Sequence, residues 1–222
     1  MRRARHRGVS IVEFCFVMLV LTPLLLGTIE VGFMMILSLQ TIQLARDAGH
    51  MYARGSDFSQ PGNQTILTAL GSDVGLSATA GAGSAVVILS TVTYVDQGLC
   101  AADGKVDGHG NPSGCTNYTQ WVFTQRLTIG KSALRSSNFG SPVTTGANPV
   151  TIAANGSVSL NDQVTNAGDV ATFNSIDPYQ NNQGVVSGLP SGQVVYIAEA
   201  AAQGFSMPPF ANNPTMYSFN LF

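Results

Sequence analysis

Two glutamates lie in a part of the chain that otherwise carries no charge. Glu13 and Glu30 interrupt an apolar run of 29 residues, from Ile11 to Leu39, in a chain of 222 residues. A carboxylate inside the hydrocarbon of a membrane costs about 2.5 to 3.5 kcal/mol on insertion scales, so each is first treated as a functional candidate. Glu30 also has a simpler interpretation, in which it lies near the outer interface and reaches water as the helix tilts. Glu13 could lie at the cytoplasmic interface, but its neighbours indicate a larger role.

Cys100 and Cys115 are candidates for a disulfide. Both lie in a 23-residue connection, residues 96–118, that contains five glycines, and a structureless loop of that length is unusual inside a compact domain. Closing about 15 residues removes on the order of 3 kcal/mol of unfolded-chain entropy, and thiols outside the cytoplasm are oxidised. We therefore predict this disulfide, with two unpaired thiols as the alternative. Cys15 is interpreted as a small apolar membrane residue.

No group of side chains has the spacing of a catalytic or metal site. The three histidines lie in separate segments without Cys, Asp or Glu partners for zinc or a nucleophile triad: His6, His50 and His109. Residues 103–114 invite comparison with a calcium loop, but Lys105 and Gly114 stand where two of the four oxygen ligands are required. We predict no enzymatic activity, no metal and no cofactor.

A long helix must position the two glutamates. The apolar run exceeds the roughly 20 residues that span a bilayer, and helical spacing continues to Arg54, before a plausible stop at Gly55. A helix from Ser10 to Arg54 would be about 68 Å long, more than twice the ~30 Å hydrocarbon core. Its extension has an apolar stripe of Leu37, Leu44, Ala48 and Met51.

The residues before the helix determine its expected orientation. Four arginines precede it, which places the N-terminus in the cytoplasm by the positive-inside rule: Arg2, Arg3, Arg5 and Arg7. A cleavable secretory signal is the competing interpretation, and it predicts a soluble product that begins near residues 45 to 55. Against it, the apolar run is about twice the usual 7 to 15 residues, and no convincing A-x-A-like site follows.

The segment Arg7-Gly-Val-Ser-Ile-Val-Glu13-Phe14 resembles the processing site of type IV prepilins, and residues 7–55 resemble the TadE-like minor pilins of tight-adherence (Flp-type) pili. In that family a short basic leader ends in Gly, a membrane peptidase cuts after it, and the fifth residue of the mature chain is Glu, followed by an aromatic residue. Gly8, Glu13 and Phe14 match these positions. The resemblance implies cleavage between Gly8 and Val9, and a role in assembly for Glu13 and Phe14.

The implied function is structural. The chain would be a minor pilin or pseudopilin that takes part in assembly of a tight-adherence pilus after cleavage. Its partners would be the prepilin peptidase, other pilins and pilus assembly proteins, and the bacterial inner membrane, which it would cross once with its C-terminal domain outside the cytoplasm. From there it could enter the surface pilus. The alternative is a secreted or membrane-anchored adhesion or binding module with an ordinary signal sequence.

The remaining chain has the pattern of one β-rich domain. We expect strands at 85–95, 120–129, 192–201 and 216–222, a short hairpin at 150–160 around Asn155-Gly156, and long surface loops at 131–149 and 161–191. The strand around Trp121 should have one buried face, with Val122 on the other. Nucleic-acid binding is disfavoured, because six basic and twelve acidic residues follow the leader. The predicted fold class is α+β, with a basic leader at 1–8, a transmembrane and amphipathic helix at 9–55, and a small antiparallel β-sheet domain with long polar loops at 56–222.

Overall fold

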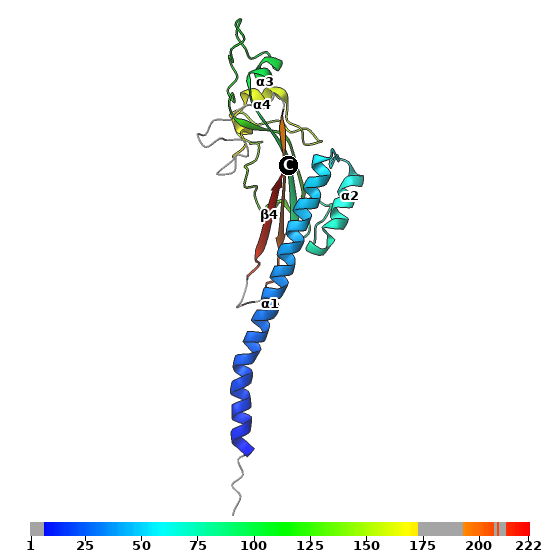
Figure 1. Ribbon diagram of the computed structural model, residues 1–222, viewed down its shortest axis with the longest axis vertical. Helices are drawn as coiled ribbons and strands as arrows, with labels where there is room; N and C mark the ends of the chain where they lie inside the picture. The colour runs from blue at the N-terminus through cyan, green and yellow to red at the C-terminus, as the bar shows by residue number, and fades with distance from the viewer. Residues whose placement is uncertain (1–6, 173–192, 207, 209–211) are drawn as a thin grey trace, which may run out of the picture.

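The computed structural model describes residues 7–172, 193–206, 208 and 212–222, with side chains from residue 11 onward. The long helix α1, Arg7–Ala53, projects from a small β domain that packs against its C-terminal half (Figure 1). Four strands follow: β1 (Ala85–Tyr94), β2 (Trp121–Gly130), β3 (Val194–Gln203) and β4 (Thr215–Leu221). The α+β fold class predicted from the sequence is confirmed.

The helix α1 has 47 residues, a length of about 70 Å at 1.5 Å per residue. It ends one residue before the predicted end. Gly55 has a φ of 85° and its N–H donates to the Tyr52 carbonyl at 2.9 Å, while the Ser56 N–H donates to the Met51 carbonyl at 3.0 Å. A left-handed glycine that satisfies the last carbonyls is a common helix stop, so the stop predicted at Gly55 is confirmed.

The strands form one antiparallel sheet in the order β2-β1-β3-β4. Their bounds lie within a few residues of the predicted strands. Nine of the ten residues of β1 are buried, as expected for a central strand that is apolar on both faces. Val122 is a correction, because it is fully buried on the face predicted to be open. There it packs in a small core with Val95, Cys100 and Val164.

The packing face of α1 continues the predicted stripe. Leu44, Ala45 and Ala48 are buried against alternate residues of β1 and β3. The contacting positions of β3 are alanines at 198, 200 and 202, and such small side chains allow the helix backbone to approach the sheet closely. The Tyr52 hydroxyl ties helix to sheet through Thr91 Oγ1 and Gln125 Oε1, both at 2.7 Å.

Four short elements were not predicted. The helix α2 (Pro61–Leu70) lies beside the upper part of α1 (Figure 1) and begins at a proline, which is favoured in the first helical turn. Its Leu67 is fully buried in the core with α1, and the 3₁₀ turn η1 (Ser72–Val74) follows it. Two further turns of this kind are η2 (Ser132–Leu134) and η3 (Ala167–Asp169).

Two expected loops contain short helices, which corrects the prediction for 96–118 and 161–191. The helix α3 (Gln97–Ala102) is capped by Asp96, which accepts the Leu99 N–H at 2.8 Å, and α4 (Leu160–Thr165) is capped by Ser159, which accepts the Asp162 N–H at 3.2 Å. Both residue types are strong N-caps. Residues 173–191 of the second loop lie outside the described residues.

The hairpin predicted at 150–160 is reduced to one bridge, between Ile152 and Val158, around a turn at Gly156 with a φ of 81°. It stays short because Leu160 already begins α4. Residues 131–149 contain η2 and otherwise neither helix nor strand, so the loop predicted there is largely confirmed.

Candidate assembly helix and its glutamates

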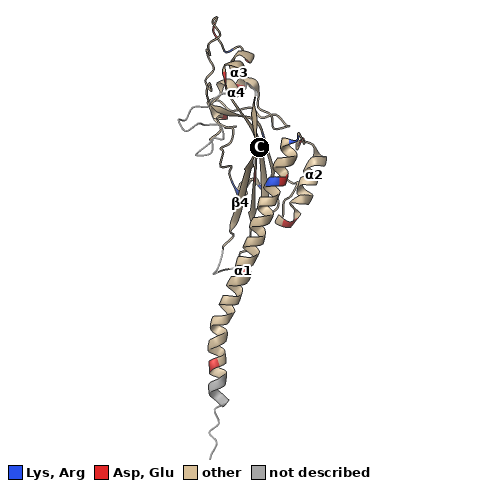
Figure 2. Ribbon diagram, in the orientation of Figure 1, with Lys and Arg blue, Asp and Glu red and all other residues tan. Residues whose placement is uncertain are grey.

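Most of the exposed large apolar side chains of the described chain lie on α1, and its N-terminal half carries a nearly continuous run of them. Every side chain from Ile11 to Leu26 is exposed, and Figure 2 shows this half almost free of charged residues. The helix is long and apolar enough to cross a membrane, which is compatible with single-pass anchoring. An exposed surface of this size marks a membrane or protein interaction site, so lipid or other helices must cover it.

The predicted processing and assembly residues lie at the free end of this helix. Gly8 and Val9 are in its first turn, and the leader residues before Arg7 lie outside the described residues. Glu13 and Phe14 are exposed, Phe14 by 58%. Within the described chain no hydrogen-bond partner approaches the Glu13 carboxylate. Both side chains are therefore open to another molecule.

Glu30 is buried, which corrects the expectation that it reaches water. Its side chain is 5% exposed, and neither carboxylate oxygen has a hydrogen-bond partner among the described residues. Glu30 lies on the sheet-facing side of α1, seven residues before Leu37 and eleven before Thr41, the spacing of one helix face. Glu30 lines a cleft together with residues 203–206, which include the last residue of β3 and the start of the connection toward β4.

A cleft of about 890 Å³ opens beside Glu30. One wall is α1 from Glu30 to Gln40, and the others are η1 and residues 203–206, which follow the end of β3. The rings of Phe33 and Phe205 meet edge to face at 6.3 Å across it. The lining of the cleft combines apolar side chains with polar ones such as Gln40 and Gln203, and it includes Glu30, whose carboxylate oxygens are buried and unpaired among the described residues.

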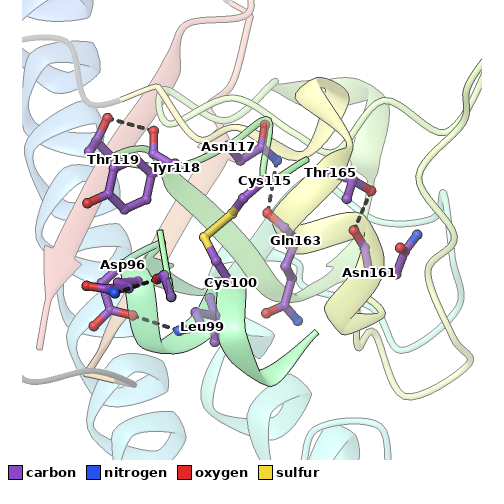
Figure 3. Close-up of a disulfide and its surroundings, with 12 residues drawn as sticks. Asp96, Leu99, Cys100, Cys115, Asn117, Tyr118, Thr119, Asn161, Gln163 and Thr165 are labelled. Carbon is purple, nitrogen blue, oxygen red and sulfur yellow. Dashed lines mark hydrogen bonds between the residues drawn. A yellow bond between two sulfur atoms is a disulfide. The ribbon is translucent and has the colours of Figure 1, made fainter. Parts of the chain in front are cut away.

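The disulfide predicted between Cys100 and Cys115 is confirmed. It joins α3 to the chain just before β2 (Figure 3). The Asn117 side chain, which was not singled out in the sequence, continues this link by donating to the Gln163 and Asn166 carbonyls at 2.9 and 2.8 Å. Cys15 is free and exposed on α1.

A second buried carboxylate, Glu199 on β3, is fully satisfied. It accepts hydrogen bonds from the Tyr217 hydroxyl, the Ser137 hydroxyl and the Asn138 N–H. The guanidinium of Arg126 lies 4.0 Å away. Burial and the hydrogen bond to Glu199 raise the pKa of Tyr217. The sequence pattern gave no sign of this cluster, because its residues come from four separate segments: β2, residues 137–138, β3 and β4. Its groups are occupied in fastening residues 137–139 to the sheet.

No three His, Cys, Asp or Glu residues in the described part of the chain are placed to hold a metal ion. In the segment compared with a calcium loop, the exposed Asp107 carboxylate accepts the N–H groups of His109 and Asn111 at 2.9 and 2.8 Å. These are the bonds of an exposed turn.

An exposed apolar helix that ends in a packed sheet domain, with Glu13 near its free end, has the geometry expected from the resemblance. Residues 8–50 match the family model described as TadE-like protein. The TadE-like segment covers about a fifth of the chain and contains both glutamates. No curated protein and no solved structure matches the chain.

The TadE-like segment includes both the exposed part of α1 and the part that is buried in the domain core. Its first half is the exposed apolar surface, and its second half, through Ala45 and Ala48, is part of the domain core. The match supports involvement in tight-adherence pili. The cleavage at Gly8–Val9, the roles of Glu13 and Phe14, and the division at residues 8 and 55 stay predictions.

Proposed function

We propose that this protein is a minor pilin or pseudopilin that takes part in assembly of a tight-adherence pilus after a prepilin peptidase cuts the Gly8–Val9 bond. The observation that carries the proposal is the TadE-like match on a helix whose projecting half exposes apolar side chains and Glu13. In the inner membrane lipid covers this half, and in a filament the helices of other pilins would replace the lipid. The domain would lie outside the cytoplasm.

The packing of α1 disfavours an ordinary cleaved signal. Such a cut would begin the soluble product near residues 45 to 55, so it would remove Leu44 and, from most positions in this range, Ala45 and Ala48. These side chains are buried in the main core beneath the sheet. Loss of a buried Leu alone costs about 2 to 5 kcal/mol when it becomes Ala, so the domain needs the end of this helix. Cleavage at Gly8–Val9, as in a pilin, would retain this helix in the mature chain.

Cleavage would create the charge that Glu13 can pair with. Removal of the leader takes away four arginines, so the formal charge falls from −2 to −6, and it leaves an ammonium on Val9. Unlike charges attract far more strongly in low dielectric than in water, and a buried charge without a partner costs several kcal/mol. Pairing of Glu13 with the terminal ammonium of a neighbour would favour contact between helices and set their axial stagger.

The first test is the mass of the membrane-extracted protein. We expect an N-terminus at Val9 and the loss of residues 1–8. Gly8→Phe should block the cut, because a bulky residue stands where the peptidase requires a small one. An intact full-length mass, or a cut beyond Leu39, would contradict the proposal.

The second test is Glu13→Gln, which keeps the size of the side chain and removes its charge. We expect this variant to be cleaved and to remain in the membrane, yet to be at least tenfold depleted from sheared pili and from crosslinked pilin complexes. Asp47→Asn is the matched control, because Asp47 is an exposed carboxylate on the same helix outside the apolar run. Normal recovery of Glu13→Gln would show that the carboxylate has no role in assembly.

A further inference from the structure

The carboxylate of Glu30 has no hydrogen-bond or ion-pair partner among the described residues, and its own helix has no basic side chain nearby. Glu30 is buried in the lining of the cleft, whereas buried polar groups are normally paired. Between Gly8 and Ala45 the sequence contains no Lys, Arg or His. The next basic residue, Arg46, is 16 residues further along α1, about 24 Å away at 1.5 Å per residue.

The residues that line the cleft favour a ligand that is mostly apolar and carries one positive charge. The walls of the cleft include Phe33, Leu37 and Phe205, and a second carboxylate, the exposed Asp73, stands at its rim. Along α1 it extends from Glu30 to Gln40, about 15 Å or nearly three helical turns. An apolar helix that carries one basic side chain would pack against the walls and place its charge near the carboxylates.

We propose that this cleft binds a Lys or Arg side chain from the apolar helix of a different pilus subunit, and that this cation pairs with Glu30. The inference rests on the proposed function, which supplies the neighbouring helices. A parallel copy of this chain is not the partner, because its α1 brings a cation to this level only when it is displaced by about 24 Å for Arg46 or about 32 Å for the Val9 ammonium. The pair would form in a low-dielectric setting, where a paired charge is strongly favoured over an unpaired one.

Glu13 and Glu30 would contact different neighbours. They are 17 residues apart, a separation of about 26 Å along the helix and about 100° around it at 3.6 residues per turn. Glu13 is exposed near the free end of the helix, while Glu30 lies on the sheet-facing side. Two anchors on different faces would fix both the axial position and the rotation of this subunit.

The test places a photo-reactive phenylalanine analogue at Ile36, an exposed residue that lines the cleft, in the full chain within cells that make the complete pilus system. We expect crosslinks to a peptide from another pilin whose apolar helix contains Lys or Arg. Glu30→Gln should reduce their yield at least tenfold, and the control Asp47→Asn should leave it unchanged. A yield independent of Glu30, a crosslinked peptide without a basic residue, self-crosslinks or lipid adducts would overturn the proposal.

A charge exchange then tests the pair itself. Glu30→Lys should abolish the Ile36 crosslink, and Glu in place of the identified partner cation should restore it in the Glu30→Lys background. Failure of this rescue contradicts the pairing. Formation of the Cys100–Cys115 disulfide in each variant shows that the domain has folded.

Crosslinks from a second site separate this inference from the proposed function. The same analogue at Val17, in the exposed apolar half, should crosslink to pilins whether or not Glu30 is present. Suppose that the Val17 crosslinks and the Gly8 cut are normal and that the yield of Ile36 crosslinks is unchanged by Glu30→Gln. Only the cleft proposal then fails. If Val17 yields no pilin crosslink and Gly8 is uncut, the proposed function and the cleft proposal both fail.

Discussion

Three buried carboxylates of this chain differ in their hydrogen-bond partners. Glu199 accepts hydrogen bonds from three donors, and Glu30 faces a cleft that could receive a cation. Asp169, at the end of η3, is fully buried, and both of its oxygens lack partners among the described residues. Burial, with a smaller contribution from the charge of Asp162, raises the pKa of Asp169 to about 8. Asp169 is therefore a neutral acid in the folded domain at neutral pH.

This pKa predicts that Asp169 makes folding pH-dependent. Between about pH 4 and pH 8 the unfolded chain is ionised at this position while the folded chain keeps the proton, so stability falls as pH rises through that range. Asp169→Asn removes the titration. Its gain in unfolding free energy over wild type should be on the order of 1 kcal/mol at pH 5 and larger at pH 8.

Urea unfolding of the detergent-solubilised protein at the two pH values, followed by Trp121 fluorescence, measures this difference. Asp107→Asn is the control, because hydrogen bonds from the N–H groups of Asn111 and His109 lower the pKa of the exposed Asp107 and no gain is expected there. An equal effect of Asp169→Asn at pH 5 and pH 8 would contradict the assignment.

At Gly49 the addition of a single side-chain carbon would disturb the packing of α1 on the sheet. Gly49 faces the sheet where α1 crosses β3, and a Cβ there would overlap the ring of Phe222 and lie 3.0 Å from the Ala198 Cβ. Gly49→Val should therefore destabilise the domain by about 1 to 3 kcal/mol through overpacking, measured by urea unfolding. Gly62→Ala on α2, where nothing lies within 4 Å, should cause no comparable loss. An unchanged midpoint for Gly49→Val would show that α1 can move away from the sheet.

At the scale of elements, the far end of the sheet is held by covalent and polar links instead of by α1. The disulfide closes a loop with a sequence separation of 15 between Cys100 and Cys115. Cys100 packs with Val122 and Val164, so the bridge fastens α3 over the start of β2 and beside α4. The main core under α1 shares none of these residues.

Removal of the disulfide should therefore weaken the α3 end and leave α1 in place. The double variant Cys100→Ser, Cys115→Ser should lose on the order of 3 kcal/mol of stability, and protease cleavage should appear first in residues 96–118. Non-reducing peptide mapping of the wild type should link these two cysteines. Cys15→Ser is the control and should leave unfolding unchanged. Alkylation of both thiols without prior reduction would refute the bridge.

At the scale of the whole molecule, α1 serves two environments that meet near Leu37. Below this level most side chains are exposed and apolar, with Glu30 as the buried exception, and above it one face of the helix forms the core with β1 and β3. The helix is thus both the segment that we propose crosses the membrane and a structural element of the domain. A change of tilt in the membrane would be transmitted directly to the sheet.

This shared role predicts where the chain can be shortened. A fragment that begins at Gln40 keeps Leu44, Ala45, Ala48 and Tyr52 and should fold as a soluble domain with one cooperative unfolding transition. A fragment that begins at Ser56 exposes the face of β1 and β3 that α1 covers, and should aggregate or lack a cooperative transition. Circular dichroism and size-exclusion chromatography distinguish these outcomes. A well-folded fragment from Ser56 would show that the domain does not depend on the helix.

The sequence alone determined the elements whose pattern is local. The 3.6-residue stripe through Leu44 and Ala48, the stop at Gly55, and the apolar and alternating runs of the four strands are visible without a structure, because helix and strand periods are set by the backbone itself. The Cys100–Cys115 pair could also be predicted, since loop length and an oxidising compartment favour it. The six-residue helices α3 and α4 escaped prediction because no period can be recognised in so short a segment, and the ten-residue α2 has no side-chain cap to mark its start.

Only the tertiary structure decided what covers each apolar or polar face. Val122 is buried because α4 and the disulfide region reach over it, and Glu199 is satisfied by residues 137–139 and β4, far away in sequence. Glu30 lies on the sheet-facing side of α1, but its burial depends on how far the end of β3 reaches along the helix. Periodicity encodes which side of an element faces inward. It does not encode the partner, because contacts between distant segments form only when the whole chain packs.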